Sequence, residues 1–373
     1  MKALSHKLSK QSKVFFFILI LLVSVFSRTP IVLAQESLVW NLLKELVLLP
    51  GVSTKEEEVA AAIIKRLPSS LKPQKDNMGN VWFTVGEGRP YLLFVAHMDE
   101  LGFYVQEIAP QGTLKLRSTG GFLLSNYEGE AVTVWTKKGR VEGIIRPRRG
   151  YLQTEPQRWE LESLEVDIGA DSPAEAQALG IQIGDQVTFR KRVIDLSPDL
   201  LAARAVDDRA GCASLLAAAL GVDWQKIKGK KVVFAWSVQE EVGLRGAAKL
   251  AEEMRPDYVF AVDTFVSTDS PLENQRFGLA RVGEGAVIRA IDSSTIVPHH
   301  ELERVVKLAS SRKIPLQWAN SRGGNDGSVF IPKGAVNIPL SWPGAYAHSF
   351  IEKISRQDLE ALTNLVIAIV EAW

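Results

Sequence analysis

Two kinds of hydrophobic pattern alternate along this chain. Over residues 36–49 and 55–67, apolar side chains recur at helical spacing, and the apolar runs 80–86 and 91–97 indicate two strands joined by a turn. From residue 200 onward, segments with helical spacing alternate with short apolar strands. Such alternation is typical of a largely parallel sheet flanked by helices on both faces. The elements expected there are helices 208–220, 245–254, 300–311 and 356–372 and strands 232–236, 258–262, 286–290, 315–319 and 335–340.

The pattern between residues 102 and 198 is different. Short strand-like segments are separated by glycines and charged turns, and only one short helix, residues 172–180, is indicated. This texture is typical of a small β-barrel or sandwich. We therefore predict an α/β domain in two parts, residues 36–101 and 199–373, with an inserted β domain over residues 102–198. The strand-like segments of the insert are 103–108, 113–118, 131–136, 140–145 and 186–191.

The amino terminus has the pattern of a secretory signal peptide. Four lysines precede the apolar block Val14–Phe26, which is followed by Pro30 and by small residues up to Ala34. The block is too short to cross a bilayer comfortably as a helix. We therefore expect residues 1–34 to be a signal peptide and the protein to be exported to the periplasm or the exterior. An uncleaved leader would instead anchor the chain in a membrane.

Composition narrows the possible partners. The chain has 373 residues, of which 46% are hydrophobic and 23% charged, as in ordinary globular proteins with room for about two domains. Its net charge is +1, and residues 1–35 hold five basic residues and no acid, so removing those five charges leaves −4. No basic surface is indicated, so we expect no nucleic-acid partner. The single cysteine, Cys212, lies in an apolar helical run and is predicted to be a packed thiol.

Histidines and acids follow the ends of several predicted strands. In an open parallel sheet, ligands gather outside the carboxyl ends of the strands, so these side chains are expected to meet at one edge. Imidazole and carboxylate donors suit two divalent cations, either zinc or else cobalt or manganese. Two histidines, one for each ion, with a shared aspartate between them could hold such a pair. The residues concerned are His97 and Asp99, Asp207, Glu240 and Glu241, Asp263, and His348.

The two adjacent glutamates are expected to have different roles. Neighbouring side chains on an extended chain point in different directions, so Glu240 and Glu241 cannot both face the same ion. One of them would bind metal, and the other would accept a proton from water. Asp99 follows His97 by two residues on the same face of the chain and could orient its imidazole.

Five segments resemble, in order, the motifs of the dinuclear aminopeptidases that include the glutamyl and the tetrahedral aminopeptidases. They are "AHMDELGFYV", "AVDDRAG", "QEEVGLRGA", "VDTF" and "AHS". The segment "DIGADSPAEAQALGIQIGDQV" resembles the inserted domain of that family, and the likeness covers nearly all of residues 36–373. The resemblance implies a zinc-peptidase-like α/β domain and an inserted β domain that assembles dimers or larger homo-oligomers.

The resemblance also implies a role for each candidate residue. Asp207 would bridge the two metals, Glu240 would be the general base, and Asp99 would support His97. The full set of implied metal ligands is His97, Asp207, Glu241, Asp263 and His348.

The chain departs from the family pattern in three places. It has "GGND" at Gly323–Asp326 where the family usually has "GGTD", and we expect a turn or a substrate-lining loop there. It keeps Tyr346 but lacks the arginine that often precedes the last histidine, and its Arg146–Gly150 segment replaces one that carries a histidine in many relatives. These differences bear on substrate preference and oligomer state. Two further histidines, His299 and His300, fall at a helix start and are expected at the surface.

The sequence therefore predicts an exported metal-dependent aminopeptidase that acts on peptides. A related dinuclear hydrolase, a carboxypeptidase or a deacylase, would share the metals and differ in what holds the end of the substrate. An inactive binding or scaffold protein on an old peptidase fold is the third reading. The complete set of implied ligands and base argues against it.

Overall fold

The computed structural model describes residues 37–124, 126–148, 150, 160–272 and 280–373. The predicted signal peptide, residues 1–34, lies outside the described residues. In the described part of the chain, none of the helices combines the length and the apolar character needed to cross a membrane.

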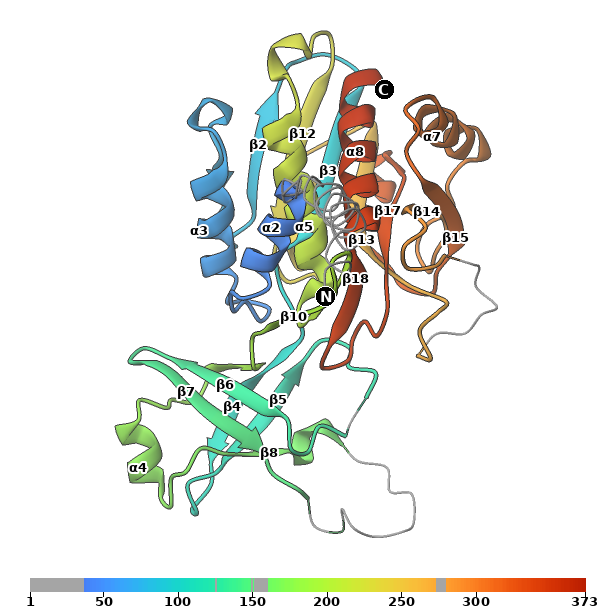
Figure 1. Cartoon of the computed structure of the whole chain (residues 1–373). Helices are drawn as coiled ribbons and strands as arrows, with labels where there is room; N and C mark the ends of the chain where they lie inside the picture. Colours follow the sequence, from blue (N-terminus) through green and yellow to red (C-terminus); the bar gives the residue numbers. More distant parts are fainter. Residues whose placement is uncertain (1–36, 125, 149, 151–159, 273–279) are drawn as a thin grey trace, which may run out of the picture. The chain divides into compact units, whose positions relative to one another are not determined.

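A nine-stranded sheet runs through the α/β part of the chain (Figure 1). Its four central strands are parallel, and all seven residues of the second of them are buried. This is the pattern expected of a strand covered on both faces. In sheet order the central strands are β12 (Lys231–Ser237), β3 (Tyr91–His97), β13 (Tyr258–Val266) and β17 (Leu340–Gly344).

The sheet as a whole is mixed, so the prediction of a largely parallel sheet describes only its centre. β2 (Val81–Val85) runs antiparallel to β12, and β1 (Gln74–Lys75) runs antiparallel to β2. At the other edge, β14 (Ala286–Ile291) is antiparallel to β17 and parallel to β15 (Leu316–Asn320). The connection from β2 to β3, residues 86–90, is too short to hold a crossover helix, so it reverses the chain direction.

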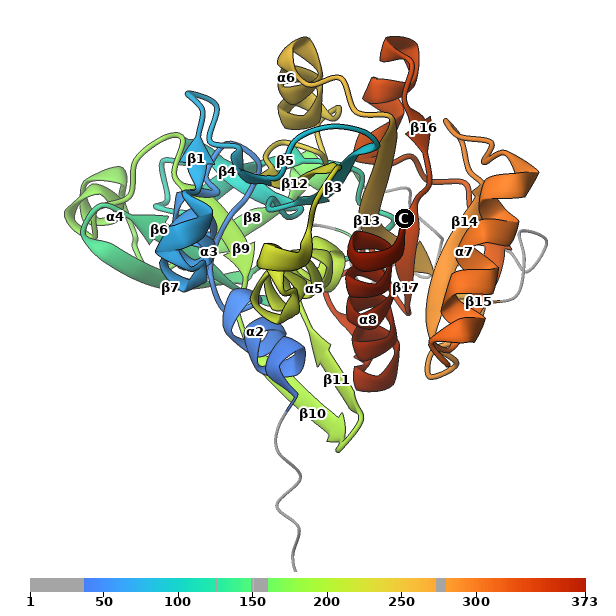
Figure 2. The same ribbon diagram turned by 90° about the horizontal axis from the view of Figure 1, so that it is seen from above.

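Helices cover both faces of the sheet, and alternate residues of each strand face opposite layers (Figure 2). Along β3, Leu92 and Phe94 pack in the larger core, whereas Leu93 and Val95 pack in the smaller one. The smaller core is covered by α6 (Arg245–Glu253) and the short helix η5 (Asp326–Lys333). The larger core is covered by α2 (Leu38–Leu46), α3 (Glu57–Arg66), α5 (Val206–Gly221), α7 (His299–Ser311) and α8 (Arg356–Ala372).

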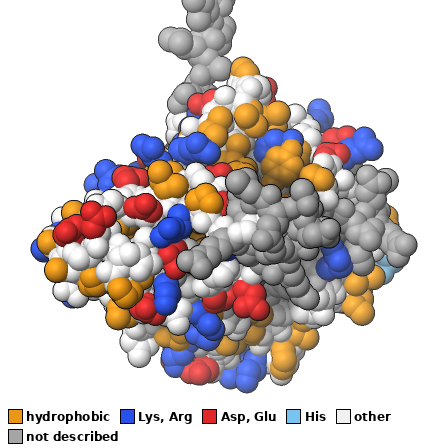
Figure 3. All heavy atoms as spheres, turned by 90° about the horizontal axis from the view of Figure 1, so that it is seen from below, with side chains coloured by type: hydrophobic (Ala, Val, Ile, Leu, Met, Phe, Trp, Pro, Cys, Tyr) orange, Lys and Arg blue, Asp and Glu red, His pale blue; other side chains and the backbone are white. Residues whose placement is uncertain are grey.

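The middle of the chain forms a closed six-stranded barrel with a hydrophobic core of its own. The sequence predicted a small β-barrel or a sandwich, and the structure shows that it is a barrel. Its three-residue strand β8 is too short to show a hydrophobic pattern and was not predicted. On the face shown in Figure 3, hydrophobic side chains lie scattered among acidic and basic ones. In barrel order the strands are β4 (Gly102–Ile108), β5 (Leu114–Thr119), β8 (Glu165–Asp167), β7 (Gly139–Ile145), β6 (Ala131–Thr136) and β9 (Gln186–Phe189), and α4 spans Pro173–Ala178.

A small three-stranded sheet that the sequence did not predict joins three distant parts of the chain. Its middle strand, β11 (Leu200–Ala203), pairs with β10 (Val193–Ser197) and with β18 (Glu352–Ser355). This pairing brings the segment just before α5 next to the segment that follows His348. The predicted strand 335–340 is also split, into β16 (Val336–Asn337) and β17. Pro339 lies in the gap, where a residue without an N–H cannot extend a ladder.

Candidate metal centre

The ends of three of the four central strands meet at one level, where two of the predicted side chains, His97 and Asp263, lie. His97, the last residue of β3, is in register with Ser237, the last residue of β12. Val95 is in register with Ala261 of β13, so Asp263, two residues further on, lies level with His97. Glu240 and Glu241 follow β12 in the next turn. The structure thus brings the predicted residues together at the carboxyl edge of the sheet.

Asp207 reaches the same place because the first residues of α5 are not helical. The backbone of Asp207 and Asp208 leaves the helical region, and Asp208 caps the helix by accepting the N–H of Gly211 at 3.0 Å. Its other oxygen accepts the N–H of His97 at 3.2 Å. Asp208 is therefore the acid that caps this helix. The side chain of Arg209 donates to the carbonyl oxygen of Met98.

Two overlapping groups of donor atoms result, and Asp207 belongs to both. In each group the donor atoms lie within 4.8 Å of one another. The Nε2 atom of His97 lies 3.4 Å from Oδ1 of Asp207, and the Nε2 atom of His348 lies 3.5 Å from Oδ2. One carboxylate thus faces two imidazoles, one with each oxygen. The first group is His97, Asp207 and Asp263, and the second is Asp207, Glu241 and His348.

Glu240 belongs to neither group, although it lies beside them. Its Oε2 atom is 4.0 Å from Nε2 of His97, and its side chain is 15% exposed at the mouth of the site. Asp99 lies behind His97, with Oδ1 3.3 Å from the imidazole Nδ1. Its carboxylate also accepts the backbone N–H groups of Glu240 at 2.9 Å and Glu241 at 3.2 Å. One aspartate therefore fixes both the first histidine and the turn that carries the two glutamates.

The site concentrates acidic groups where water is scarce. Burial raises the pKa of Glu241 to about 7 and raises the pKa of Glu240 well above its usual value. Burial opposes a charge on His348, but Glu241 and Asp207 raise the pKa of that imidazole to about 10. Burial also opposes the charge on Asp207, yet the two imidazoles hold the pKa of its carboxyl below the usual range. Crowded buried acids of this kind need positive charge nearby.

Divalent cations fit this donor set. Oδ1 of Asp207 is buried and accepts no hydrogen bond from the described residues, so it is available as a ligand. Nitrogen and carboxylate oxygen together form a donor set that zinc, cobalt or manganese accepts.

Two buried residues that the sequence analysis missed hold the ligands in place. Arg289 of β14 lies 3.4 Å from Oδ2 of Asp263 and also donates to the hydroxyl of Ser341. Glu352 accepts the backbone N–H of Asp207 at 3.1 Å and pairs with the buried Arg204. Arg289 could have been singled out from the sequence, because it is a charged residue in the middle of the apolar run "AVIRAI". Nothing in the sequence around Glu352 distinguishes it from a surface acid.

An open pocket of about 350 Å³ leads to the cluster. Gly323 and Gly324 line it, so the first half of the "GGND" segment, expected to be a turn or a substrate-lining loop, lies at the wall of this pocket. The second half is buried, and the Asp326 carboxylate accepts the hydroxyl of Ser237. The other side chains that line the pocket include Leu123, Val266, Leu272 and Arg322.

His299 and His300 lie at the surface, as expected, with side chains 86% and 80% exposed.

Comparisons with known proteins show which proteins this chain is similar to. The family model described as M42 glutamyl aminopeptidase matches residues 79–365. The chain is similar to the putative aminopeptidase FrvX of Escherichia coli, with 31% identity over 338 residues that cover 87% of this chain and 93% of FrvX. It is 28% identical to the glutamyl aminopeptidase of Lactococcus lactis over 74% of this chain and 80% of that protein. The solved structure of the Pyrococcus horikoshii TET1 peptidase superposes with a TM-score of 0.82 at 34% identity, covering 90% of this chain and 100% of the other.

The same comparisons overturn the predicted location. FrvX, the L. lactis glutamyl aminopeptidase and TET1 are cytosolic peptidases, so the prediction of an exported protein is wrong. The pattern of lysines, apolar residues and small residues in the first 34 positions is short and compositional. It carries less information about location than similarity over most of the chain does.

Proposed function

The chain belongs to the M42 glutamyl aminopeptidase family, and from this membership we propose that it removes amino-terminal residues from peptides at a pair of divalent metal ions. The chain is thus a metal-dependent aminopeptidase by family. The pairing of the metals and the roles of individual side chains are our proposal. The observation that carries it is Asp207, whose two carboxylate oxygens face His97 and His348 separately.

Each proposed role follows from where a side chain lies. His97 and Asp263 would hold one ion, Glu241 and His348 the other, with Asp207 shared between them. Two divalent ions held this way would polarise the scissile carbonyl and lower the pKa of a water molecule beside it.

Glu240 is proposed as the general base. It lines the pocket beside the ligands and belongs to neither ligand group. Its buried carboxylate has a raised pKa, which suits a group that takes a proton from water and then gives it to the leaving amine. Asp99 would keep the imidazole of His97 turned toward the centre of the site and would hold the backbone of Glu240.

The barrel is proposed as the part that assembles subunits. The TET1 structure is described as assembling into a tetrahedron or a large octahedral shell, and we propose a homo-oligomer for this chain too. The barrel exposes apolar side chains suited to such contacts, among them Ile144, which is 55% exposed, and Ile183, which is 72% exposed. In this proposal residues 102–198 form the inserted domain, and residues 36–101 and 199–373 form a zinc-peptidase-like catalytic domain.

The test is a panel of aminoacyl anilides, assayed after loading the chain with zinc, cobalt or manganese in turn. We expect hydrolysis that depends on metal and stops on chelation. A peptide with a free amino terminus and the same peptide acetylated at that terminus should be compared in parallel. Preference for the acetylated peptide would favour a deacylase or carboxypeptidase. Failure to bind any divalent ion would favour an inactive binding or scaffold protein.

A further inference from the structure

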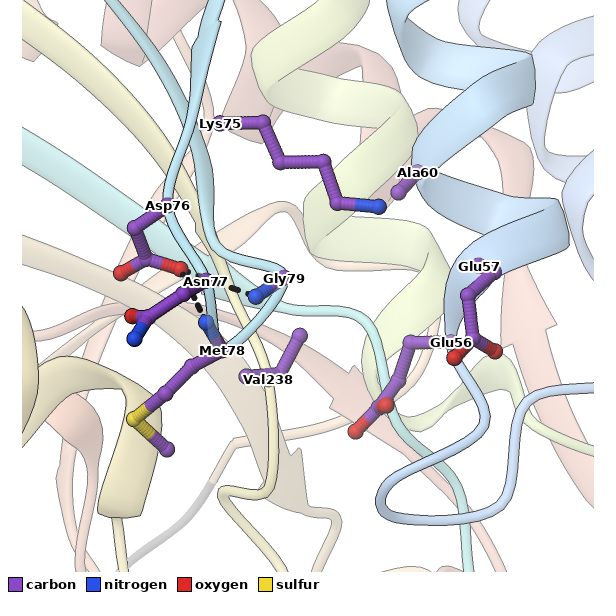
Figure 4. A pocket seen from close by; sticks show the side chains of 9 residues that line it. All are labelled: Glu56, Glu57, Ala60, Lys75, Asp76, Asn77, Met78, Gly79 and Val238. Carbon is purple, nitrogen blue, oxygen red and sulfur yellow. Dashed lines mark hydrogen bonds between the residues drawn. The ribbon is translucent and has the colours of Figure 1, made fainter.

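A second pocket, of about 230 Å³, is lined in part by Val238, two residues before Glu240 (Figure 4). On one side of this pocket Asp76 holds its own turn, through hydrogen bonds from the N–H groups of Met78 and Gly79. On the other side are Glu56 and Glu57, at the start of α3. Glu57 is exposed, whereas Glu56 is only 4% exposed. A buried glutamate next to an exposed one at a helix start calls for a physical reason.

Glu56 is buried because it connects two distant segments. Its Oε1 atom accepts the backbone N–H of Thr54 and the backbone N–H of Gln239, each at 3.0 Å. Gln239 is 183 residues away in the sequence and directly precedes Glu240. Its φ of +56° lies in the left-handed region, which a residue other than glycine adopts only where its surroundings hold it.

Together with Asp99, Glu56 accepts the N–H groups of three consecutive residues, Gln239, Glu240 and Glu241, in the turn that carries the two glutamates. Glu56 accepts the N–H of Gln239, and Asp99 accepts those of Glu240 and Glu241. Three consecutive backbone donors are thus received by two carboxylates from outside the turn. Hydrogen bonds to charged acceptors are the stronger kind, so this arrangement fixes the direction in which both glutamate side chains leave the backbone.

We propose that Glu56 is a positioning residue, which holds the backbone of Gln239 so that the carboxylate of Glu240 points into the site. The proposal rests on the role given above to Glu240 as general base. Glu56 touches neither the pocket that leads to the cluster nor any of the proposed ligands. Its effect on turnover therefore passes through the turn.

The surroundings of Glu56 do not favour its charge. Burial and the nearby carboxylate of Asp99 raise the pKa of Glu56 to about 7. The residue is held in an unfavourable place for an acid, as expected where geometry at a site matters more than stability.

The proposal is tested by two replacements of Glu56, one that shortens the side chain and one that removes its charge. Glu56→Asp keeps the carboxyl group but shortens the side chain by one methylene, so it cannot reach Gln239. Glu56→Gln keeps the reach and an acceptor oxygen but removes the charge. The exposed neighbour gives the matched control, Glu57→Asp. For each full-length, metal-loaded variant we would measure kcat, KM, metal content and melting temperature, together with amide hydrogen exchange in a peptide spanning residues 239–241.

We expect Glu56→Asp to lower kcat at least tenfold, with KM within twofold and both metals retained. Amide exchange in the peptide should rise. Glu56→Gln should recover kcat to within about threefold of the parent, and Glu57→Asp should match the parent. The inference is overturned if Glu56→Asp leaves kcat within twofold, or if Glu56→Gln is as impaired as Glu56→Asp. A loss explained entirely by lower melting temperature or lost metal would also overturn it.

The exchange measurement separates this inference from the proposed function. If the parent hydrolyses no aminoacyl substrate, the proposed function fails. Faster exchange over residues 239–241 in Glu56→Asp, and parental exchange in Glu56→Gln, would still show that Glu56 holds the turn. Unchanged exchange in both variants, with an active parent, would refute the inference alone.

Discussion

The Nδ1 atom of His348 lies 2.6 Å from the carbonyl oxygen of Gly121. Gly121 follows the barrel strand β5, so a barrel loop fixes a side chain of the candidate metal centre. The same loop binds the backbone of the histidine, because the N–H of Leu123 donates to the carbonyl oxygen of His348 at 3.2 Å. A histidine that donates from one ring nitrogen presents the other as a ligand, here Nε2 facing Asp207 and Glu241.

This contact predicts that a small change in the barrel loop weakens one metal position. Gly120 has a φ of +83°, and a Cβ atom there would lie 2.0 Å from a methyl carbon of Leu101 and 3.3 Å from Cβ of Glu241. Gly120→Ala should therefore shift the loop and displace the Gly121 carbonyl from His348. We expect metal content to fall from two ions toward one per chain, measured by elemental analysis after dialysis.

A matched glycine controls for backbone strain. Gly129 has a similar φ of +86°, but nothing lies within 4 Å of the Cβ that alanine would add. Gly129→Ala should thus keep both ions. Equal metal loss in the two variants would mean that strain in the barrel, and not the contact with His348, controls the site.

The sequence predicted those site residues that a simple rule of sheet geometry brings together. His97 and Asp263 end parallel strands, and parallel strands finish at one edge, so their meeting follows from the order of the elements. Gly121 and Glu56 follow from no such rule. The first acts through a backbone carbonyl, which has no signature in sequence, and the second contacts a residue 183 positions away. Arg289 is an intermediate case. Its charge inside an apolar strand indicates that it needs a buried partner, but the sequence does not say which one.

We expect the buried hydroxyl of Tyr127 to make the stability of the folded chain depend on pH. Tyr127 is fully buried in the barrel core, with its ring centroid 5.0 Å from that of Phe189, and burial raises its pKa to about 12. The folded state therefore keeps the proton between pH 10 and pH 12, where the unfolded state has lost it. Stability from this residue is complete below pH 10 and is lost as the pH rises through 12.

Replacing Tyr127 with phenylalanine should remove this dependence. Melting temperatures of parent and Tyr127→Phe would be compared from pH 8 to pH 11.5. We expect the difference between them to be constant up to about pH 10 and then to shift in favour of the variant. A constant difference across the whole range would mean that the hydroxyl ionises at the same pH in both states.

Asp99 should control metal affinity at the position of His97. Its carboxylate faces the imidazole Nδ1 and keeps the ring basic, while Ser53 donates to the same carboxylate at 2.6 Å. Asp99→Asn removes the negative charge and should weaken binding at that position by about 10- to 100-fold. Competition with a chromophoric chelator would measure it. Ser53→Ala removes one donor and leaves the charge, so a loss as large as in Asp99→Asn would contradict the argument.

The two adjacent glutamates make the sharpest test of the site, because they are neighbours in sequence with different predicted effects. Glu241 lies 3.9 Å from Nε2 of His348 and belongs to a ligand group, whereas Glu240 lies beside both groups and lines the pocket. Glu240→Gln should therefore keep both ions and lower kcat by about 10²- to 10⁴-fold, the usual contribution of a general base. Glu241→Ala should lose one ion, and its activity should return in part at high metal concentration.

Metal content and turnover must be measured on the same preparations, because either result alone has two explanations. A Glu240→Gln variant that also loses an ion would make Glu240 a ligand, and the base would then have to be sought elsewhere in the pocket. A Glu240→Gln variant with parental turnover of aminoacyl anilides would remove the base from the proposal altogether. Loss of turnover with both ions in place and with parental amide exchange over residues 239–241 is the combination that assigns proton transfer to Glu240, because the ligands and the backbone of the turn are then unchanged.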